Sequence, residues 1–341
     1  MIFLHKRNMK NLIEKIKDAK LVGRGGAEFP TATKWEMTKK AKGHPKYVIC
    51  NASEGELAVF KDLYILKNFS EDVVKGMVLA MDFLKTKEAY FNINESYFKK
   101  VINKLHPILL KYEKKGYRFT IYKEEPSYIG GEETALLNAI EMKRIEPRMK
   151  PPFPVEAGLF SKPTLIHNVE TLFNVAKVAE GKFKPKRFYS ISGKVRHPGV
   201  YYLDDSLTVN QVLEATKNLP KFDFFAQIGG GASGLVINQT QANAQKMIGA
   251  GSLQVFPTTI KPRKMLMDWF KFYAKQSCGK CTPCREGSYQ LWQLVKNHKE
   301  VHWDKIMPIV EAMGKTSFCA LGKSIIIPVK SYLTNVLNKK L

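Results

Sequence analysis

Four of the five cysteines have a spacing that suits a metal centre. Cys278, Cys281 and Cys284 are separated by two residues each in the stretch SCGKCTPCREG, and Cys319 follows after 34 further residues. A bacterial ferredoxin run would place a fourth cysteine four positions after the third, where this chain has Ser288. The fourth ligand must therefore come from a distance. Three thiolates in one turn with a distant fourth favour a cubane [4Fe–4S] cluster; zinc, usually held by two CxxC pairs, and a chance arrangement without a metal are the alternatives.

The fifth cysteine is expected to take no part in metal binding. Cys50 ends the apolar run YVIC, which indicates a buried and inert thiol. Gly279 and Pro283 favour a tight loop between the clustered cysteines. The predicted metal ligands are thus Cys278, Cys281, Cys284 and Cys319.

A glycine-rich turn near the N-terminus could bind phosphate. The stretch GRGGAEFPTATKW (23–35) combines glycines with Arg24 and Lys34, so that close backbone approach and cationic donors coincide. It is not the G-x-G-x-x-G fingerprint, and a tight turn with surface charges is the alternative. Phe29 and Trp35 are either core residues or stacking platforms.

Two acidic segments offer hydrogen-bond acceptors for a nucleotide-like ligand. NASEGE contributes Asn51, Glu54 and Glu56, and YIGGEE contributes Tyr128, Glu132 and Glu133. Carboxylates repel phosphates, but they suit amides, ribose hydroxyls or a ring N–H. By contrast, the glycine run QIGGGASG (227–234) is interpreted as a loop, and the lone His167 as structural.

The elements that must position these residues alternate between helix and strand up to about residue 186. Apolar runs predict strands at 46–52, 88–94 and 117–123. Helical spacing predicts helices at 71–84, capped by Ser70, and at 95–105 and 130–144. This alternation predicts an α/β fold with a parallel sheet, whose ligands bind at the carboxyl ends of the strands.

The rest of the chain consists of two segments that differ in predicted secondary structure. Residues 187–262 contain short predicted strands at 187–195, 199–203, 224–230 and 252–256 and one helix at 208–218, a small β-rich module. Residues 263–341 read as four helices, at 264–275, 282–297, 301–313 and 322–337. We therefore predict three domains, at 1–186, 187–262 and 263–341.

The charge is strongly positive, with 55 basic and 31 acidic residues and a net charge of +24. The lysines are scattered and no nucleic-acid-binding module is present, so we expect solvated lysine faces, suited to acidic partners, rather than specific nucleic-acid binding. No apolar run is long enough to span a membrane, and the apolar run in MIFLHKRNMK is too short for a secretory signal. We expect a cytoplasmic protein.

Several motifs together resemble one known family. GRGGAEFPTATKW, VICNASEGE with FKD, YIGGEETALLNAIE, RMKPPFPVEAGLFSKPTLIHNVETL, and SCGKCTPCREG with FCALG stand here in that family's order. The chain resembles the flavin-containing, NADH-oxidising 51-kDa (F) subunit of respiratory complex I. The family includes diaphorase subunits of NAD-linked hydrogenases and formate dehydrogenases. The resemblance covers nearly the whole chain.

The resemblance implies a fold and a set of site residues. The three domains would be a Rossmann-like FMN and NADH domain, a β-grasp domain, and a C-terminal four-helix bundle carrying a [4Fe–4S] cluster bound by the four cysteines. Glu56 would lie beside the nicotinamide. The other implied FMN and NAD(H) contacts are Gly23, Arg24, Gly25, Gly26, Phe29, Lys34, Asn51, Glu54, Tyr128, Gly131, Glu132, Glu133, Lys150, Phe153, His167 and Asn168.

The implied activity is hydride transfer from NADH to FMN, followed by single-electron transfer to the cluster. The implied partners are a [2Fe–2S] thioredoxin-like subunit and a large iron–sulfur subunit, which would place the chain at the inner face of the cell membrane. Two alternatives are kept: a diaphorase subunit of a soluble hydrogenase or formate dehydrogenase, and an electron-transfer or scaffold subunit with impaired nucleotide binding.

The second alternative rests on departures from the family pattern. The family usually has glycine where this chain has Glu28, an aromatic residue at Met37, aspartate at Ser53 and asparagine at His167. Its EPG motif is replaced by residues 56–58, Glu-Leu-Ala. All of these lie in or beside the expected nucleotide contacts, whereas the cysteines are intact.

Overall fold

The computed structural model describes residues 11–125 and 127–339. It divides into two compact units, one of Met1–Gly55 and Phe60–Pro185 and the other of Glu56–Val59 and Lys186–Leu341. The expected three domains remain a prediction, and their outer ends at 1–10 and 340–341 lie outside the described residues. The stretch MIFLHKRNMK lies outside them as well.

The first unit is built on a parallel sheet, as predicted. Its four strands are β1 (Tyr47–Ala52), β2 (Glu88–Asn94), β3 (Arg118–Glu124) and β4 (Thr164–Asn168), in the order β3-β2-β1-β4. The chain passes from β1 to β2 on one side, and β4 pairs with the other side of β1. The strand order therefore reverses between β1 and β4, the position where open α/β sheets bind ligands.

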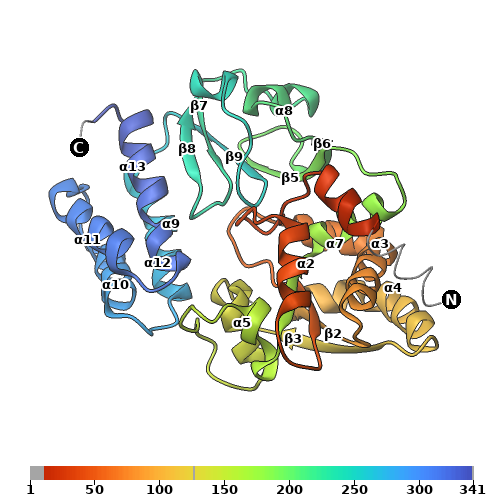
Figure 1. Ribbon diagram of the computed structural model, residues 1–341. Coiled ribbons are helices and arrows are strands. Elements are labelled where there is room, and N and C mark those ends of the chain that lie inside the picture. The colour runs from red at the N-terminus through yellow and green to blue at the C-terminus, as the bar shows by residue number, and fades with distance from the viewer. Residues whose placement is uncertain (1–10, 126, 340–341) are drawn as a thin grey trace. The chain divides into compact units, whose positions relative to one another are not determined.

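Helices cover both faces of this sheet (Figure 1). One face packs against α3 (Lys61–Leu84), α4 (Glu95–Glu113) and α7 (Val169–Ala179). On the other face Ile49 and Ile166 join Leu136 and Leu137 of α5 (Glu133–Ile140) in one apolar cluster. Residues 11–18, α2 (Thr31–Lys40), α6 (Pro154–Ala157) and the 3-10 helices η1 (Ile129–Gly131) and η2 (Leu159–Ser161) complete the unit.

Two helix predictions need correction. The helix expected from residue 71 begins at Lys61, and Ser70 lies inside it, just after a break at Phe69. The Ser70 hydroxyl donates a hydrogen bond to the Leu66 carbonyl of the preceding turn. It therefore satisfies a backbone acceptor at the break and does not cap an N-terminus. The helix expected at 130–144 is shorter because η1 precedes α5, whose first turn is capped by Glu132.

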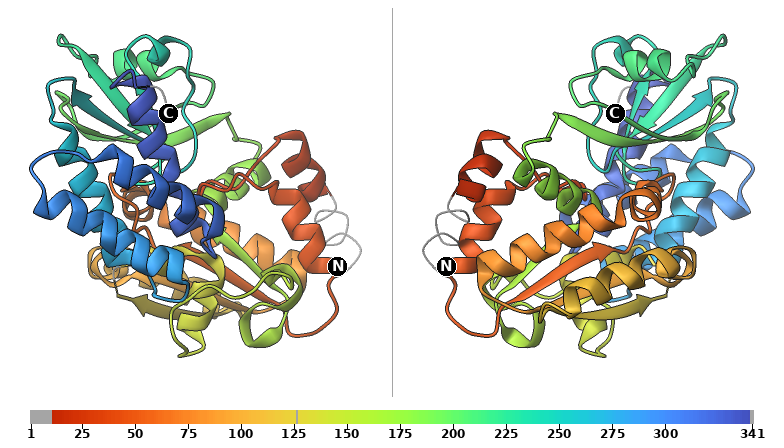
Figure 2. Two further views of the ribbon diagram at one scale, coloured as in Figure 1. Left: turned by 90° about the vertical axis from the view of Figure 1, so that its left-hand side faces the viewer. Right: turned by 90° about the vertical axis from the view of Figure 1, so that its right-hand side faces the viewer.

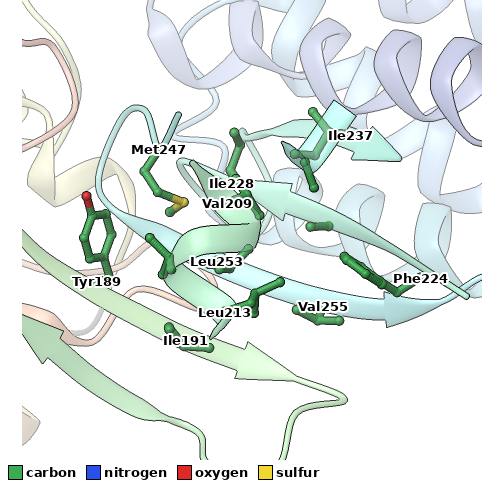
Figure 3. Close-up of a cluster of buried hydrophobic side chains, with 13 residues drawn as sticks. Tyr189, Ile191, Val209, Leu213, Phe224, Ile228, Ile237, Met247, Leu253 and Val255 are labelled. Carbon is green, nitrogen blue, oxygen red and sulfur yellow. The ribbon is translucent and has the colours of Figure 1, made fainter. Parts of the chain in front are cut away.

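The second unit contains a five-stranded mixed sheet in the order β6-β5-β9-β7-β8. The strands are β5 (Lys186–Gly193), β6 (Gly199–Asp204), β7 (Phe224–Ile228), β8 (Leu235–Asn238) and β9 (Ser252–Pro257). Helix α8 (Val209–Ala215) packs its apolar side on the sheet, where Val209 and Leu213 meet Ile191 and Leu253 (Figure 3). The 3-10 helix η3 (Gln241–Asn243) follows β8, a strand that was not predicted.

The remainder of this unit is helical. It consists of α9 (Pro262–Gln276), α10 (Thr282–Asn297), α11 (Trp303–Thr316), α12 (Ala320–Ser324) and α13 (Ile326–Asn335), packed side by side (Figure 2). The last predicted helix is two helices, which meet at Ile325. Among the residues that the structure describes, no helix is long and apolar enough to cross a membrane.

Candidate functional site

Loops of the first unit meet closely at the carboxyl end of β1. The Asn51 side chain donates to the Gly131 carbonyl over 2.9 Å, and its oxygen accepts from the Ser53 N–H at 3.2 Å. A Cβ at Gly131 would lie 2.8 Å from the Ser53 carbonyl, and one at Gly55 would overlap the Ser127 backbone. Only glycine allows this approach, so residues 51–55 and 127–131 of the two predicted segments lie against each other in the first unit.

Four charged side chains of that site form a network. Lys150 Nζ lies 2.9 Å from Glu132 and 3.0 Å from Glu133, and Lys34 Nζ lies 3.2 Å from Glu133. Burial would raise the pKa of Glu133, but Lys34 and Lys150 outweigh it and hold that pKa below its usual value. Glu132 also accepts from the N–H groups of Thr134 and Ala135. Both side chains are therefore fixed by their partners, and the lowered pKa of Glu133 favours its ionised form.

The glycine turn is anchored beside β4. The Gly23 N–H donates to the Phe29 carbonyl at 2.9 Å, which closes the turn, and the Arg24 N–H donates to the Thr171 hydroxyl of α7 at 2.9 Å. A Cβ at Gly25 would press on Asn168 at 3.3 Å, and Gly26 has a φ of 112°. Phe29 is 45% exposed, whereas Trp35 is fully buried, so only Phe29 can serve as a stacking platform.

A buried ionic cluster, which was not predicted, supports the same strand ends. Lys61 Nζ lies 2.8 Å from Asp62 and 3.1 Å from Glu170, and it donates to the Asn168 side chain at 3.2 Å. The three charged side chains are almost fully buried. Only the FKD part of the family motif pointed to Lys61 and Asp62.

Glu54 extends this cluster. Its carboxylate accepts from the Asp62 N–H at 3.1 Å and from the Tyr97 hydroxyl at 3.0 Å. Desolvation raises the pKa of Glu54 to about 8, and the neighbouring Asp62 carboxylate adds to the shift. Glu54 therefore retains a proton well above the usual range of a carboxylic acid.

His167 is engaged inside the protein. Its Nε2 accepts from the Trp35 indole N–H at 2.8 Å, and burial, followed by the charge of Lys34, lowers its pKa well below the usual value. The imidazole is thus neutral, which agrees with the structural interpretation of this histidine. Phe153 is half-exposed just before α6, and Tyr128 lies directly before η1.

The predicted metal ligands gather at the start of two helices in the second unit. Cys281 precedes α10 and Cys319 precedes α12, and the Phe318 N–H donates to Cys281 Sγ at 3.4 Å. Burial raises the pKa of Cys284 to about 11, and the other three thiols add to the shift. The other three cysteines thus lie close enough to Cys284 to disfavour its thiolate, and a bound cationic cluster would stabilise that thiolate.

The backbone beside Cys284 packs closely at Gly322. A Cβ at Gly322 would lie 3.0 Å from Cys284 Cβ and would overlap Ser317. Within the described residues, no three His, Cys, Asp or Glu side chains are arranged around a single metal ion. A cubane differs from one ion in that each thiolate binds a different iron atom. Cys50, as expected, is fully buried in β1, which raises its thiol pKa.

Comparisons with known proteins match both sites. Residues 16–177 match the family model of the Nuo51 FMN-binding domain, and residues 264–338 match that of the NADH-ubiquinone oxidoreductase-F iron–sulfur binding region. The F subunit of the NADH-quinone oxidoreductase of Streptomyces coelicolor is 32% identical, over 95% of this chain and 80% of its own length. The F 2 subunit of the Rhizobium meliloti enzyme is 31% identical, over 91% and 83%.

A hydrogenase relative also matches. The alpha subunit of HoxS, the NAD-reducing hydrogenase of Cupriavidus necator, is 30% identical over 95% of this chain and 59% of its own length. The crystal structure of an NAD⁺-reducing [NiFe]-hydrogenase in the H2-reduced state has a TM-score of 0.87 and 28% identity, over 96% of this chain and 61% of that one. The chain thus spans about three fifths of these two hydrogenase subunits.

Fold, cysteines and switch-point residues together define a flavin- and iron–sulfur-containing oxidoreductase that uses NADH. The chain belongs to the family of NADH-quinone oxidoreductase F subunits. Its cofactors are FMN, NAD(H) and a [4Fe–4S] cluster, so the zinc alternative is set aside.

Proposed function

We propose that this chain is the electron-input subunit of a complex I-type assembly, in which it oxidises NADH. The observation that carries the proposal is that one chain holds both a charged, glycine-lined site at the switch point of its sheet and a set of four clustered thiols. The strand-end residues and the glycine turn would hold FMN, and the four cysteines would hold the [4Fe–4S] cluster; when bound, these groups would supply hydride-accepting and single-electron redox chemistry.

The residues of the chain have distinct roles in this proposal. The Gly23–Gly26 turn binds phosphate through the backbone N–H groups of Gly25 and Gly26, because those of Gly23 and Arg24 donate within the protein, and Arg24 and Lys34 add positive charge. Asn51, Glu54, Tyr128, Gly131, Glu132 and Glu133 line the flavin pocket, with Asn168 at its rim. Phe29, Lys150 and Phe153 contact the nucleotide, and Glu56 lies beside the nicotinamide. Glu132 and Glu133, both held by Lys150, offer acceptor oxygens that suit hydroxyl and amide donors.

The parent assembly is the finer part of the proposal. A thioredoxin-like [2Fe–2S] subunit and a large iron–sulfur subunit would receive the electrons, and they would hold the chain at the inner face of the cell membrane. The hydrogenase relative favours a second candidate, a diaphorase subunit of a soluble NAD-linked hydrogenase. Purification of the native assembly separates the two, because a membrane arm or a hydrogenase subunit would copurify.

The proposed activity is tested by adding NADH to the oxidised holoprotein without oxygen. We expect the visible absorbance of the flavin to bleach, and the reduced protein to pass electrons to menadione, an uncharged quinone. If excess NADH leaves the flavin oxidised while dithionite reduces it, the chain is a scaffold or electron-transfer subunit and the proposal fails.

A further inference from the structure

The Glu56 side chain is held by a glycine-rich loop of the second unit. Its Oε1 accepts from the Ala232 N–H at 2.9 Å, and its Oε2 accepts from the Ser233 hydroxyl at 2.6 Å. The next residue, Leu57, accepts through its carbonyl from the Gly231 N–H at 2.8 Å. Each carboxylate oxygen has its own donor, which fixes both the direction and the plane of the group.

The glycines of this loop are required by the close contact. A Cβ at Gly230 would lie 2.9 Å from Glu56 Cδ and 2.6 Å from Ser233 Oγ. A Cβ at Gly231 would lie 2.5 Å from the Leu57 carbonyl oxygen. The run QIGGGASG, which the sequence indicated only as a loop, therefore has the shape needed to receive residues 56 and 57.

Two side chains of helix α9 hold this loop by hydrogen bonds to its backbone carbonyls. The buried Trp269 indole donates to the Gly231 carbonyl at 3.1 Å, and the Tyr273 hydroxyl donates to the Ala232 carbonyl at 3.2 Å. The loop thus has little freedom to follow Glu56 if that side chain moves. A rigid support of this kind is what a precisely oriented site residue needs.

We propose that the Gly230–Ser233 loop orients the Glu56 carboxylate for NADH, with Ser233 as a positioning residue that acts through Glu56. This inference rests on the proposed place of Glu56 beside the nicotinamide. Ser233 itself contacts neither substrate nor flavin in this account. Its hydroxyl holds the Glu56 carboxylate in one rotamer, so that this hydrogen-bond acceptor is already oriented when NADH binds.

Ser233→Ala tests the proposal. A charge-assisted hydrogen bond is lost, so we expect NAD⁺ binding, measured by calorimetry on the oxidised holoprotein, and kcat/KM for NADH each to fall about tenfold. Ser233→Thr keeps the hydroxyl and should restore most of both. Should Ser233→Ala fail to fold, Ser233→Cys, with its weak S–H donor, serves the same purpose.

Ser206→Ala is the matched control. Ser206 donates to the Asp204 carboxylate at 2.5 Å in the same unit, so the same type of bond is removed at an exposed place. We expect no change in NAD⁺ binding from it. An equal loss in this control, or an unimpaired Ser233→Ala protein with normal flavin content, overturns the proposal.

Glu56→Ala completes a double-mutant cycle. If Ser233 acts only through Glu56, adding Ser233→Ala to Glu56→Ala should cause no further loss. Independent, additive losses would overturn the positioning role and leave the proposed function intact. Unchanged NAD⁺ binding and NADH kinetics in Glu56→Ala alone would instead refute the proposed role of Glu56, and this inference with it.

Discussion

Glu28 combines an unusual side chain with an unusual backbone conformation. It stands at the end of the glycine turn with a φ of 51°, in the left-handed region that glycine adopts without cost. The family's usual glycine at this position thus has a backbone explanation as well as a binding one. Non-glycine residues in this region cost about 1–2 kcal/mol.

Glu28→Gly is therefore expected to stabilise the fold, by about 1 kcal/mol after the added freedom of the unfolded chain is subtracted. Chemical denaturation of both proteins measures the difference. Glu36 lies in α2, where it pairs with Lys17. Glu36→Gly should instead destabilise the protein, because glycine is unfavourable inside a helix. Equal stability of wild type and Glu28→Gly would show that the turn imposes no such cost.

The same substitution should also change binding. A carboxylate at the end of the turn that we propose to bind phosphate would repel a pyrophosphate by about 1 kcal/mol in water at 4 Å, and by more when partly buried. We expect Glu28→Gly to lower KM for NADH at low salt with nearly unchanged kcat. An unchanged KM would mean that the Glu28 carboxylate points away from the nucleotide.

Glu54 should make stability depend on pH. Its pKa is raised to about 8 in the folded protein, whereas an unfolded glutamate ionises near 4.3. Between these values the folded state keeps a proton that the unfolded state has lost, so the free energy of unfolding falls as pH rises. Glu54→Gln removes this effect and should raise the melting temperature more at pH 8 than at pH 5. A gain of equal size at both pH values would contradict the assignment.

At the scale of elements, the cluster depends on two helices, α10 and α12, that begin directly after cysteines. Without Cys319, one iron of a cubane lacks its protein ligand, so we expect Cys319→Ala to lose the cluster or to be severely destabilised. The flavin unit should still transfer electrons from NADH to menadione. Cys50→Ala, a change inside β1, is the control and should keep its iron. Iron loss from the control alone would mean that the fourth ligand is wrongly assigned.

How far the elements follow from the sequence depends on what stabilises each one. Strands β1 and β2 are rich in apolar and aromatic residues, and both were predicted almost to the residue. The start of α3 was not predicted, because its first residues, Lys61 and Asp62, are charged and yet buried. Their burial depends on the ion pairs of Lys61 with Asp62 and Glu170. No periodicity reveals such a pairing between distant segments.

Some parts of the site were predictable from the sequence and others were not. Motif spacing pointed to the cysteines and the glycine turn because their chemistry is local. The bonds from Ala232 and Ser233 to Glu56 join residues far apart in the chain, and only the folded structure brings them together. The role of QIGGGASG therefore could not be seen in its own composition.

At the scale of the whole molecule, the net charge of +24 should govern encounters with acidic redox partners. Raising the ionic strength from about 0.01 M to 0.15 M shortens the screening length from about 30 Å to about 8 Å. Electron transfer from the NADH-reduced protein to the acidic haem domain of cytochrome b5 should slow about tenfold or more. Transfer to uncharged menadione should hardly change. A salt-independent rate with the acidic protein would exclude electrostatic steering.

The central claim is that this chain links NADH, one flavin and one iron–sulfur cluster. The most direct test is a combined flavin, metal and electron paramagnetic resonance analysis of the natively purified protein before and after NADH. We expect about one FMN and about four iron atoms per chain, with a cluster signal that NADH induces. Zinc in place of iron, together with the absence of flavin, would contradict the account.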